Sequence, residues 1–253
     1  MSQSNLVITT QPEEQAQHVI QMLSKAGVKV FDLPMIEIKL YEPNYTISRI
    51  IRSLESFNLL MFTSKNGVRG FFHSLKALQG NFSLHGKLKI AAIGKSTAME
   101  VERYNHKADI INTGKTSDDF LVQLKRDVIN SESKVLLVLG NLAPDKLYKS
   151  IDELCFVQRI NVYETTRPKS INEATLALVK NQKADMMVFT SPSAFQNFID
   201  ITNIKPENQK MKIACIGQTT GNFIRSKGFN LNLVATKPEI DSFAEEIIQY
   251  LNH

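Results

Sequence analysis

Short apolar runs alternate along this chain with segments whose apolar residues recur at helical spacing. The runs at Leu59–Phe62, Val135–Val138 and Met186–Phe189 are continuously apolar, which is typical of parallel strands covered on both faces. The segment Phe243–Leu251 instead has one apolar face at helical spacing. This alternation predicts an α/β fold in which helices cover both faces of parallel sheets. The predicted strands are Leu6–Thr9, Lys29–Leu33, Leu59–Phe62, Lys89–Ile93, Ala108–Ile111, Val135–Val138, Phe156–Val162, Met186–Phe189, Lys212–Ile216 and Leu231–Val234.

Two stretches of the sequence occur twice, in the same order. Leu59–Phe72 reads LLMFTSKNGVRGFF, and Met186–Ile199 reads MMVFTSPSAFQNFI, 127 residues later. Lys89–Thr97 reads KIAAIGKST, and Lys212–Thr220 reads KIACIGQTT, 123 residues later. In each copy an apolar run predicts a strand, and the polar residues after it predict the start of a helix. The duplication therefore predicts two similar lobes with a cleft between them.

The repeat is compatible with two domain arrangements. A tandem would divide the chain near residue 128, whereas the alternative joins the first small unit to the last large one and makes one domain discontinuous. Two extended segments, Pro34–Pro43 and Asn161–Pro168, each run toward a proline, which disfavours helix. They favour the discontinuous arrangement with two crossing linkers, but periodicity does not decide between the two.

The four duplicated turns place hydroxyl residues and glycines between strands and helices. Ser64 and Ser191 are predicted N-caps, and Gly94 and Gly217 allow close approach of the backbone. The first N–H groups of a helix attract anions, and open α/β sheets bind ligands at the carboxyl ends of their strands. Ser and Thr also cap helices that bind nothing, so both interpretations are open for any single turn. The duplication favours a cleft that binds a polyanion.

Composition and charge narrow the function only slightly. The chain has 253 residues, a net charge of +5 and an apolar fraction of 43%, as in ordinary globular proteins. The mild positive charge suits an anionic small molecule, and the lack of a Lys/Arg cluster disfavours nucleic acid. No signal peptide and no run long enough to span a membrane are found. We therefore expect a cytoplasmic protein in which Cys155 and Cys215 stay reduced.

The chain shows no motif for a cofactor, a metal or a strong nucleophile. Its five His residues lack ligand spacing, no GxGxxG occurs, and neither Cys has a His nearby in sequence. Tyr163 ends an extended run beside a candidate linker, where its hydroxyl could serve as a weak acid. The sequence alone favours the other interpretation, a half-buried strand tyrosine.

Together these segments resemble the uroporphyrinogen-III synthase family over nearly the whole chain. The order and spacing of several short motifs make the resemblance specific: Phe62–Ser64 and Phe189–Ser191 (FTS), Ile93–Thr97 and Ile216–Thr220 (IGx[ST]T), Val162–Glu164 (VYE), and Pro12–Ala16 at a helix start. The family commonly has Arg just before the proline of that early helix, and this chain has Gln11. If that Arg contacts the ligand, its role is lost or moved here.

The resemblance implies a fold and a reaction. The fold has two flavodoxin-like parallel-sheet domains joined by a two-stranded linker, one formed by residues 1–36 and 169–253 and the other by residues 37–168. The implied enzyme is a lyase that cyclises hydroxymethylbilane, a linear tetrapyrrole with eight carboxylates, with loss of water and inversion of ring D. It uses no cofactor or metal. It is a monomer without nucleic-acid or membrane partners, and hydroxymethylbilane synthase is a candidate for a transient contact.

The resemblance also assigns roles to residues. Tyr163 becomes the candidate acid that helps the substrate hydroxyl leave. The duplicated turns would bind the substrate carboxylates, partly through backbone N–H groups. The candidate substrate-binding residues are Thr63, Ser64, Lys65, Gly94, Ser96, Thr97, Ser191, Ser193, Gly217, Thr219, Thr220 and Thr236.

Two other functions stay open at this point. A two-lobed protein could bind a small anion as a sensor or regulatory module, and the lack of a strong catalytic constellation favours that alternative. The chain could also be a homologue that has lost activity, for which Gln11 is the hint. Adding hydroxymethylbilane and separating the isomeric products discriminates among the three.

Overall fold

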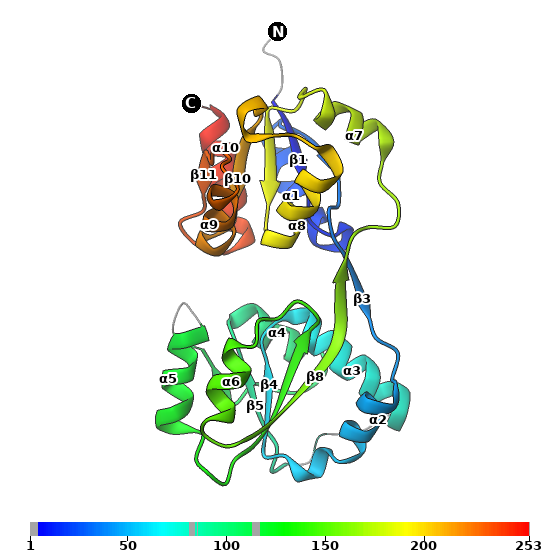
Figure 1. Cartoon of the computed structure of the whole chain (residues 1–253), viewed down its shortest axis with the longest axis vertical. Helices are drawn as coiled ribbons and strands as arrows, with labels where there is room; N and C mark the ends of the chain where they lie inside the picture. Colours follow the sequence, from blue (N-terminus) through cyan, green and yellow to red (C-terminus); the bar gives the residue numbers. More distant parts are fainter. Residues whose placement is uncertain (1–4, 81–83, 85, 113–116, 253) are drawn as a thin grey trace. The chain divides into compact units, whose positions relative to one another are not determined.

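The chain folds into two compact units, one of which is assembled from two separate stretches of sequence (Figure 1). The computed structural model describes residues 5–80, 84, 86–112 and 117–252. Unit 1 combines the N-terminal stretch that ends at Glu37 with the C-terminal stretch from Thr166 onward. Unit 2 comprises Ile38–Thr165. The predicted α/β fold with a discontinuous domain is confirmed.

Unit 1 is built on a parallel sheet whose described strands lie in the order β11-β10-β9-β1-β2. The strand order reverses between β1 and β9, and such a switch point is where open α/β sheets bind ligands. The strands are β1 (Leu6–Thr9), β2 (Lys29–Asp32), β9 (Met186–Phe189), β10 (Lys212–Cys215) and β11 (Leu233–Val234). The helices are α1 (Glu13–Lys25), α7 (Glu173–Lys180), α8 (Pro192–Thr202), α9 (Gln218–Ser226) and α10 (Ile240–Asn252), with a short 3-10 helix at Pro206–Asn208.

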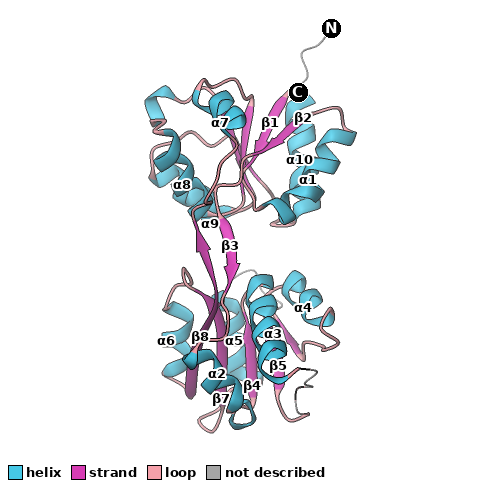
Figure 2. Ribbon diagram, turned by 90° about the vertical axis from the view of Figure 1, so that its right-hand side faces the viewer, coloured by secondary structure: helices cyan, strands magenta, loops and turns pink. Residues whose placement is uncertain are grey.

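Helices cover both faces of this sheet because successive strand residues point to opposite sides. Met187 and Phe189 of β9 pack in one apolar cluster with residues of α7, α8 and α9. Met186 and Val188 of the same strand pack in a second cluster with residues of α1 and α10. Figure 2 shows α1 and α10 on one side of the strands and α8 on the other. The continuously apolar run in β9 follows from this double coverage.

Unit 2 repeats the arrangement on a sheet ordered β3-β8-β7-β4-β5-β6, in which the four pairs from β8 to β6 are parallel. Its switch point lies between β4 and β7. The strands are β3 (Glu37–Leu40), β4 (Leu59–Phe62), β5 (Lys89–Ala92), β6 (Ile110–Ile111), β7 (Lys134–Gly140) and β8 (Phe156–Thr166). The helices are α2 (Tyr45–Arg52), α3 (Lys65–Gln79), α4 (Lys95–Glu102), α5 (Ser117–Asp127) and α6 (Lys146–Asp152), with a 3-10 helix at Leu54–Ser56.

The core of unit 2 also has two layers. Leu60 and Phe62 of β4 pack with residues of α2, α3 and α4, and Leu59 and Met61 pack with residues of α5 and α6. Helix α3 lies very close to β8, because a β-carbon at Gly70 would come within 2.6 Å of the Val162 carbonyl oxygen. This close packing sets the distance between the start of α3 and the end of β8.

Seven of the ten predicted strands have other bounds in the structure, and for two of them the contacts of the chain give the reason. The strand predicted to end at Val162 continues to Thr166, because its later residues pair with β3, where the Tyr41 N–H donates to the Val162 carbonyl at 2.9 Å. The strand predicted at Ala108–Ile111 is only two residues long. At its start, the Ile90 N–H of β5 donates to the Asp109 carboxylate at 2.7 Å, in place of a backbone carbonyl of a longer strand.

Candidate functional site

The carboxyl edge of the unit 2 sheet brings together a helix start, a glycine and a tyrosine. Phe62 pairs with Val138 across β4 and β7, so Ser64 and Gly140 lie at the same level beyond that pair. Gly140 in turn pairs with Tyr163 of β8, after a register shift between Leu139 and Gly140. These three positions therefore line the switch point of unit 2, where a ligand is expected.

The Tyr163 ring lies across Gly140 toward Ser64. A β-carbon at Gly140 would come within 2.4 to 2.9 Å of three ring carbons of Tyr163, closer than any side chain allows. The Tyr163 hydroxyl lies 3.2 Å from Ser64 Oγ, and either oxygen can donate. Tyr163 is half-buried and packs against the core of unit 2, and its hydroxyl lies at the carboxyl edge of the sheet beside Ser64.

Ser64 also caps the helix that starts there, as predicted. Its Oγ accepts the Gly67 N–H at 3.1 Å, which leaves the earlier N–H groups of α3 without a side-chain acceptor. Thr63 is half-buried and Lys65 is exposed. A hydroxyl pair and the positive end of a helix dipole therefore meet at this turn.

The second turn of unit 2 presents bare backbone donors. Gly94 is the N-cap of α4, with a φ of 82° that favours glycine, and no side chain caps the helix. Ser96 is exposed, whereas Thr97 is only 3% exposed. The N–H groups of Lys95 and Ser96 begin a helix without a side-chain acceptor, which suits an anionic ligand.

The first turn of unit 1 has the same construction as its counterpart in unit 2. Ser191 caps α8 by accepting the Ala194 N–H at 3.2 Å, and Pro192 occupies the first helical position. The hydroxyls of Ser191 and Ser193 lie 3.2 Å apart. Both N-caps predicted for the FTS turns are confirmed.

The second turn of unit 1 matches its counterpart in burial. Gly217 is the N-cap of α9, and again no side chain caps the helix. Thr219 is exposed, and Thr220 is 3% exposed, the same fraction as Thr97. Gly217 has an extended φ of −178°, so this position does not need a glycine for its backbone conformation.

Thr236 differs from the other candidates because its donors are occupied. Its N–H lies 3.1 Å from both carboxylate oxygens of Glu246, and its hydroxyl donates to the same carboxylate at 2.7 Å. This turn already binds a carboxylate of the protein itself. The N–H and hydroxyl of Thr236 are therefore engaged before any ligand binds.

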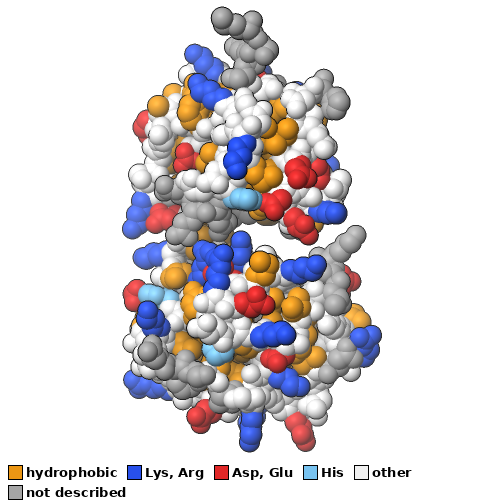
Figure 3. All heavy atoms as spheres, turned by 180° about the vertical axis from the view of Figure 1, so that it is seen from behind, with side chains coloured by type: hydrophobic (Ala, Val, Ile, Leu, Met, Phe, Trp, Pro, Cys, Tyr) orange, Lys and Arg blue, Asp and Glu red, His pale blue; other side chains and the backbone are white. Residues whose placement is uncertain are grey.

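Charge is distributed unequally between the paired turns. The first residue of α3 is Lys65 and that of α4 is Lys95, both exposed, whereas the matching positions in unit 1 are Pro192 and Gln218. Figure 3 shows basic side chains interspersed with acidic ones on the visible face of unit 2. An anion at the unit 2 turns would thus meet lysine charge, whereas one at the unit 1 turns would meet neutral donors.

Gln11 has a buried amide for which the described residues provide no partner. It is 1% exposed at the carboxyl end of β1, and neither Oε1 nor Nε2 makes a hydrogen bond. Its neighbour Thr10 donates from its hydroxyl to the Val188 carbonyl at 2.7 Å. An unpaired buried amide is costly, and this one lies beside the switch point of unit 1.

The remaining chemistry in the described residues is limited. No cluster of His, Cys, Asp and Glu in this part of the chain could hold a metal ion, and none of its helices is long and apolar enough to cross a membrane. Burial raises the pKa of the Cys215 thiol, so that thiol is a poor nucleophile.

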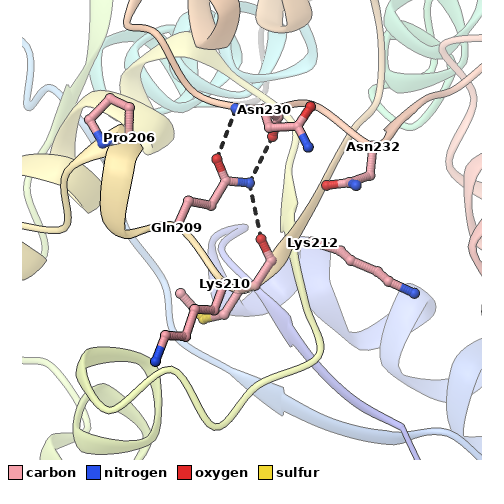
Figure 4. A pocket seen from close by; sticks show the side chains of 7 residues that line it. Pro206, Gln209, Lys210, Lys212, Asn230 and Asn232 are labelled. Carbon is pink, nitrogen blue, oxygen red and sulfur yellow. Dashed lines mark hydrogen bonds between the residues drawn. The ribbon is translucent and has the colours of Figure 1, made fainter.

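A small pocket of unit 1 lies away from the duplicated turns (Figure 4). Its lining includes Lys212, the first residue of β10, so it lies at the amino edge of the sheet. The Gln209 amide inside it bonds to the backbone of Met211 and Asn230. The pocket therefore lies where hydrogen bonds of Gln209 join two loops, and we assign it no role in the site.

Sequence reasoning missed two residues of the unit 2 site. Gly140 provides the space for the Tyr163 ring. Asn141 donates its backbone N–H to the Tyr163 carbonyl at 3.2 Å, and its side chain bonds to Thr165. The only sequence signal was a glycine at the end of a buried strand, which marks close approach of another group.

Comparisons with known proteins agree with the resemblance. The family model described as uroporphyrinogen-III synthase HemD matches residues 17–245. A uroporphyrinogen-III synthase of Chlorobaculum parvum is 27% identical over 97% of this chain and 98% of its own length. A chloroplastic uroporphyrinogen-III synthase of Oryza sativa subsp. japonica is 26% identical over 97% of this chain and 80% of its own.

Solved structures show the same fold. A mutant uroporphyrinogen III synthase from the extremely thermophilic bacterium Thermus thermophilus superposes with a TM-score of 0.68 at 16% identity, over 98% of this chain and 99% of that one. The uroporphyrinogen-III synthetase of Helicobacter pylori gives a TM-score of 0.62 at 19% identity, over 98% and 100% of the two chains. The family match spans all four duplicated turns together with Gly140 and Tyr163. The chain belongs to the uroporphyrinogen-III synthase family.

Proposed function

We propose that this protein cyclises hydroxymethylbilane to uroporphyrinogen III, with loss of water and inversion of ring D. The proposal rests on one observation: a member of this family has Ser64, Gly140 and Tyr163 together at the switch point of unit 2. Each unit also has a helix start without a side-chain cap at the carboxyl edge of its sheet, after Gly94 in unit 2 and after Gly217 in unit 1. These features together suit a substrate with many carboxylates and one hydroxyl to be removed.

Tyr163 is the proposed acid. As the carbon–oxygen bond of the hydroxymethyl group breaks, the Tyr163 O–H donates its proton and the hydroxyl leaves as water. The electron-rich pyrrole supplies the electron pair, so this step leaves an azafulvenium cation, the electrophile, and the Tyr163 phenolate. Ser64 Oγ, 3.2 Å away, donates a hydrogen bond to the phenolate that forms. The proton released when the macrocycle closes returns to Tyr163, so the acid is regenerated.

The proposed task of the turns is to hold the chain of pyrroles in one folded conformation. Ring D must attack through its substituted carbon, form a spiro intermediate and rearrange, and this outcome depends on orientation. Within each unit, substrate carboxylates bind to the first backbone N–H groups of the helices that follow Ser64 and Gly94, or Ser191 and Gly217. The exposed hydroxyls of Ser96 and Thr219 are further donors. Well-held geometry can supply roughly 7–11 kcal/mol of a barrier, so no covalent catalyst is needed.

Freshly made hydroxymethylbilane, incubated with the purified protein, tests the proposal. We expect a product that is mainly the type III isomer after oxidation and chromatographic separation. The buffer control gives the uninverted type I isomer that forms spontaneously. A protein that binds the substrate and leaves this spontaneous outcome unchanged would be a binding module, or a homologue without activity, and the proposal would be rejected.

We propose a cytoplasmic monomer that receives its substrate from hydroxymethylbilane synthase, with contact that is at most transient. The linear tetrapyrrole cyclises spontaneously, and its short lifetime supports direct transfer from hydroxymethylbilane synthase during such a transient contact. Light scattering of the protein alone, then mixed with hydroxymethylbilane synthase, measures both points. A stable dimer or a stable mixed complex would contradict them.

A further inference from the structure

The position of the Tyr163 hydroxyl depends on the loop that follows β7. The ring of Tyr163 crosses β7 at Gly140 and reaches Ser64, in the turn that follows β4, although β8 and β4 are not neighbours in the sheet. Tyr163 thus reaches Ser64 only by extending across the intervening strand. Its backbone must therefore be fixed if the hydroxyl is to stay 3.2 Å from Ser64 Oγ.

Asn141 fixes that backbone through three hydrogen bonds. Its N–H donates to the Tyr163 carbonyl at 3.2 Å. Its side-chain oxygen accepts the Thr165 N–H at 2.8 Å, and its side-chain nitrogen donates to the Thr165 carbonyl at 3.3 Å. The Asn141 side chain thus supplies hydrogen bonds to β8 just beyond Gly140, the last paired residue of β7, where the shift at Leu139/Gly140 has interrupted the regular pairing of the two strands.

Arg159 fixes the loop itself. Its guanidinium donates to the carbonyl oxygens of Gly140 and Ala143, both at 3.2 Å, and pairs with the Asp145 carboxylate at 2.5 Å. Arg159 belongs to β8, the strand that carries Tyr163. The strand and the loop therefore hold each other at two points, and the β8 residues involved, Arg159 and Thr165, lie on either side of Tyr163 in the sequence.

We infer that Asn141 is a positioning residue for the reaction, one that acts by fixing Tyr163 over Gly140. The inference rests on the proposed role of Tyr163 as acid. Asn141 itself takes no part in proton transfer. Its loss lets the Tyr163 hydroxyl move away from Ser64 while leaving the carboxylate-binding turns in place. The effect therefore falls on kcat and leaves KM nearly unchanged.

The experiment compares Asn141→Ala with Asn58→Ala. Asn58 makes a similar side-chain bond at the other end of β7, where its Oδ1 accepts the Lys134 N–H at 2.9 Å. We expect Asn141→Ala to lower kcat about tenfold, since small misplacements cost that much or more, and Asn58→Ala to leave kcat unchanged. In a Tyr163→Phe background, Asn141→Ala should cause no further loss of kcat.

Fluorine NMR provides a readout that does not depend on turnover. The protein with 3-fluorotyrosine at its six tyrosines gives a Tyr163 resonance that Tyr163→Phe identifies. We expect Asn141→Ala to shift or broaden that resonance and Asn58→Ala to leave it unchanged. If the alanine variant does not fold, Asn141→Asp keeps the acceptor for the Thr165 N–H and should show a smaller change of the same kind.

The outcomes separate the inference from the proposed function. Full turnover by Asn141→Ala, or an equal loss in the presence and absence of the Tyr163 hydroxyl, would overturn the inference and leave the role of Tyr163 standing. Full turnover by Tyr163→Phe would reject that role and the inference with it. An unmoved Tyr163 resonance in Asn141→Ala would also overturn the inference.

Discussion

Residue 140 has no side chain, and the ring of Tyr163 occupies the space that a β-carbon would take. This one contact links two features that lie far apart in sequence, the FTS turn at Ser64 and the VYE motif at Tyr163. At the scale of residues, the proposed chemistry therefore depends on a glycine and an asparagine that orient a tyrosine, and the tyrosine is the one proposed proton donor.

Tyr163→Phe tests the acid directly. We expect turnover to fall about 10²-fold, the lower range for general acid catalysis, because the phenyl ring keeps the packing and loses the proton. KM should change little, since we propose that the helix starts, and not Tyr163, bind the carboxylates. Single-turnover kinetics measure the chemical step, and Tyr45→Phe, at an exposed position of unit 2, is the control. An unchanged rate constant would remove Tyr163 as the acid.

Gly140→Ala tests the packing beneath the acid. The added β-carbon would overlap the Tyr163 ring, so we expect the free energy of unfolding to fall by about 1–3 kcal/mol. The loss should be much smaller in a Tyr163→Ala background, because the overlapping ring is gone. Urea unfolding measures both values, and Gly86→Ala, where a β-carbon would meet nothing within 4 Å, is the control. Equal losses in the two backgrounds would contradict the packing argument.

At the scale of elements, local signals predicted the strands and helix starts well. Continuous apolar runs, the N-caps Ser64 and Ser191, and Pro192 at a first helical position all depend on residues close in sequence. The crossing of Tyr163 over Gly140 was not predictable, because it depends on a register shift that only the paired strands reveal. The hydrogen bonds from Thr236 to the Glu246 carboxylate were not predicted for a similar reason, since a contact between residues ten positions apart leaves no recognisable pattern in the sequence.

The lysines at two helix starts predict a salt-dependent KM. Lys65 and Lys95 begin α3 and α4, where like charge opposes the helix dipole unless an anion binds there. We expect Lys65→Met and Lys95→Met each to raise KM about two- to fivefold at low salt, as for exposed ion pairs, with smaller effects at high salt because of screening. Steady-state kinetics across a salt series measure this.

Lys134→Met is the matched control for that series. Lys134 is exposed at the first residue of β7, on the amino edge of the same sheet, so its loss changes the net charge equally and should leave KM unchanged. The same rise in KM for Lys134→Met would show that net charge alone matters. No rise for Lys65→Met or Lys95→Met would remove these lysines from the binding site.

At the scale of the whole molecule, each unit has an apolar core of its own. Two buried clusters consist of unit 1 residues and two of unit 2 residues. Each unit also contains one cysteine, Cys155 in unit 2 and Cys215 in unit 1. The sequence repeat predicted the two similar units, but it did not show which half-repeats combine, because both arrangements preserve the same local elements.

Leu137→Ala tests the separation of the cores. Leu137 is fully buried in unit 2, so its truncation should cost about 2–5 kcal/mol. We expect Cys155 to become reactive toward a thiol reagent at a lower urea concentration than in the unsubstituted protein. Cys215, whose pKa burial raises, should keep its original midpoint. Equal shifts of both midpoints would show that the two cores unfold as one.

The isomer composition formed at a small catalytic ratio of enzyme to hydroxymethylbilane shows whether the turns and Tyr163 together fold the substrate so that ring D inverts, and whether the product is then released for another cycle. We expect mainly type III uroporphyrinogen at this ratio, because each enzyme molecule acts many times. The type I composition of the buffer control would contradict it.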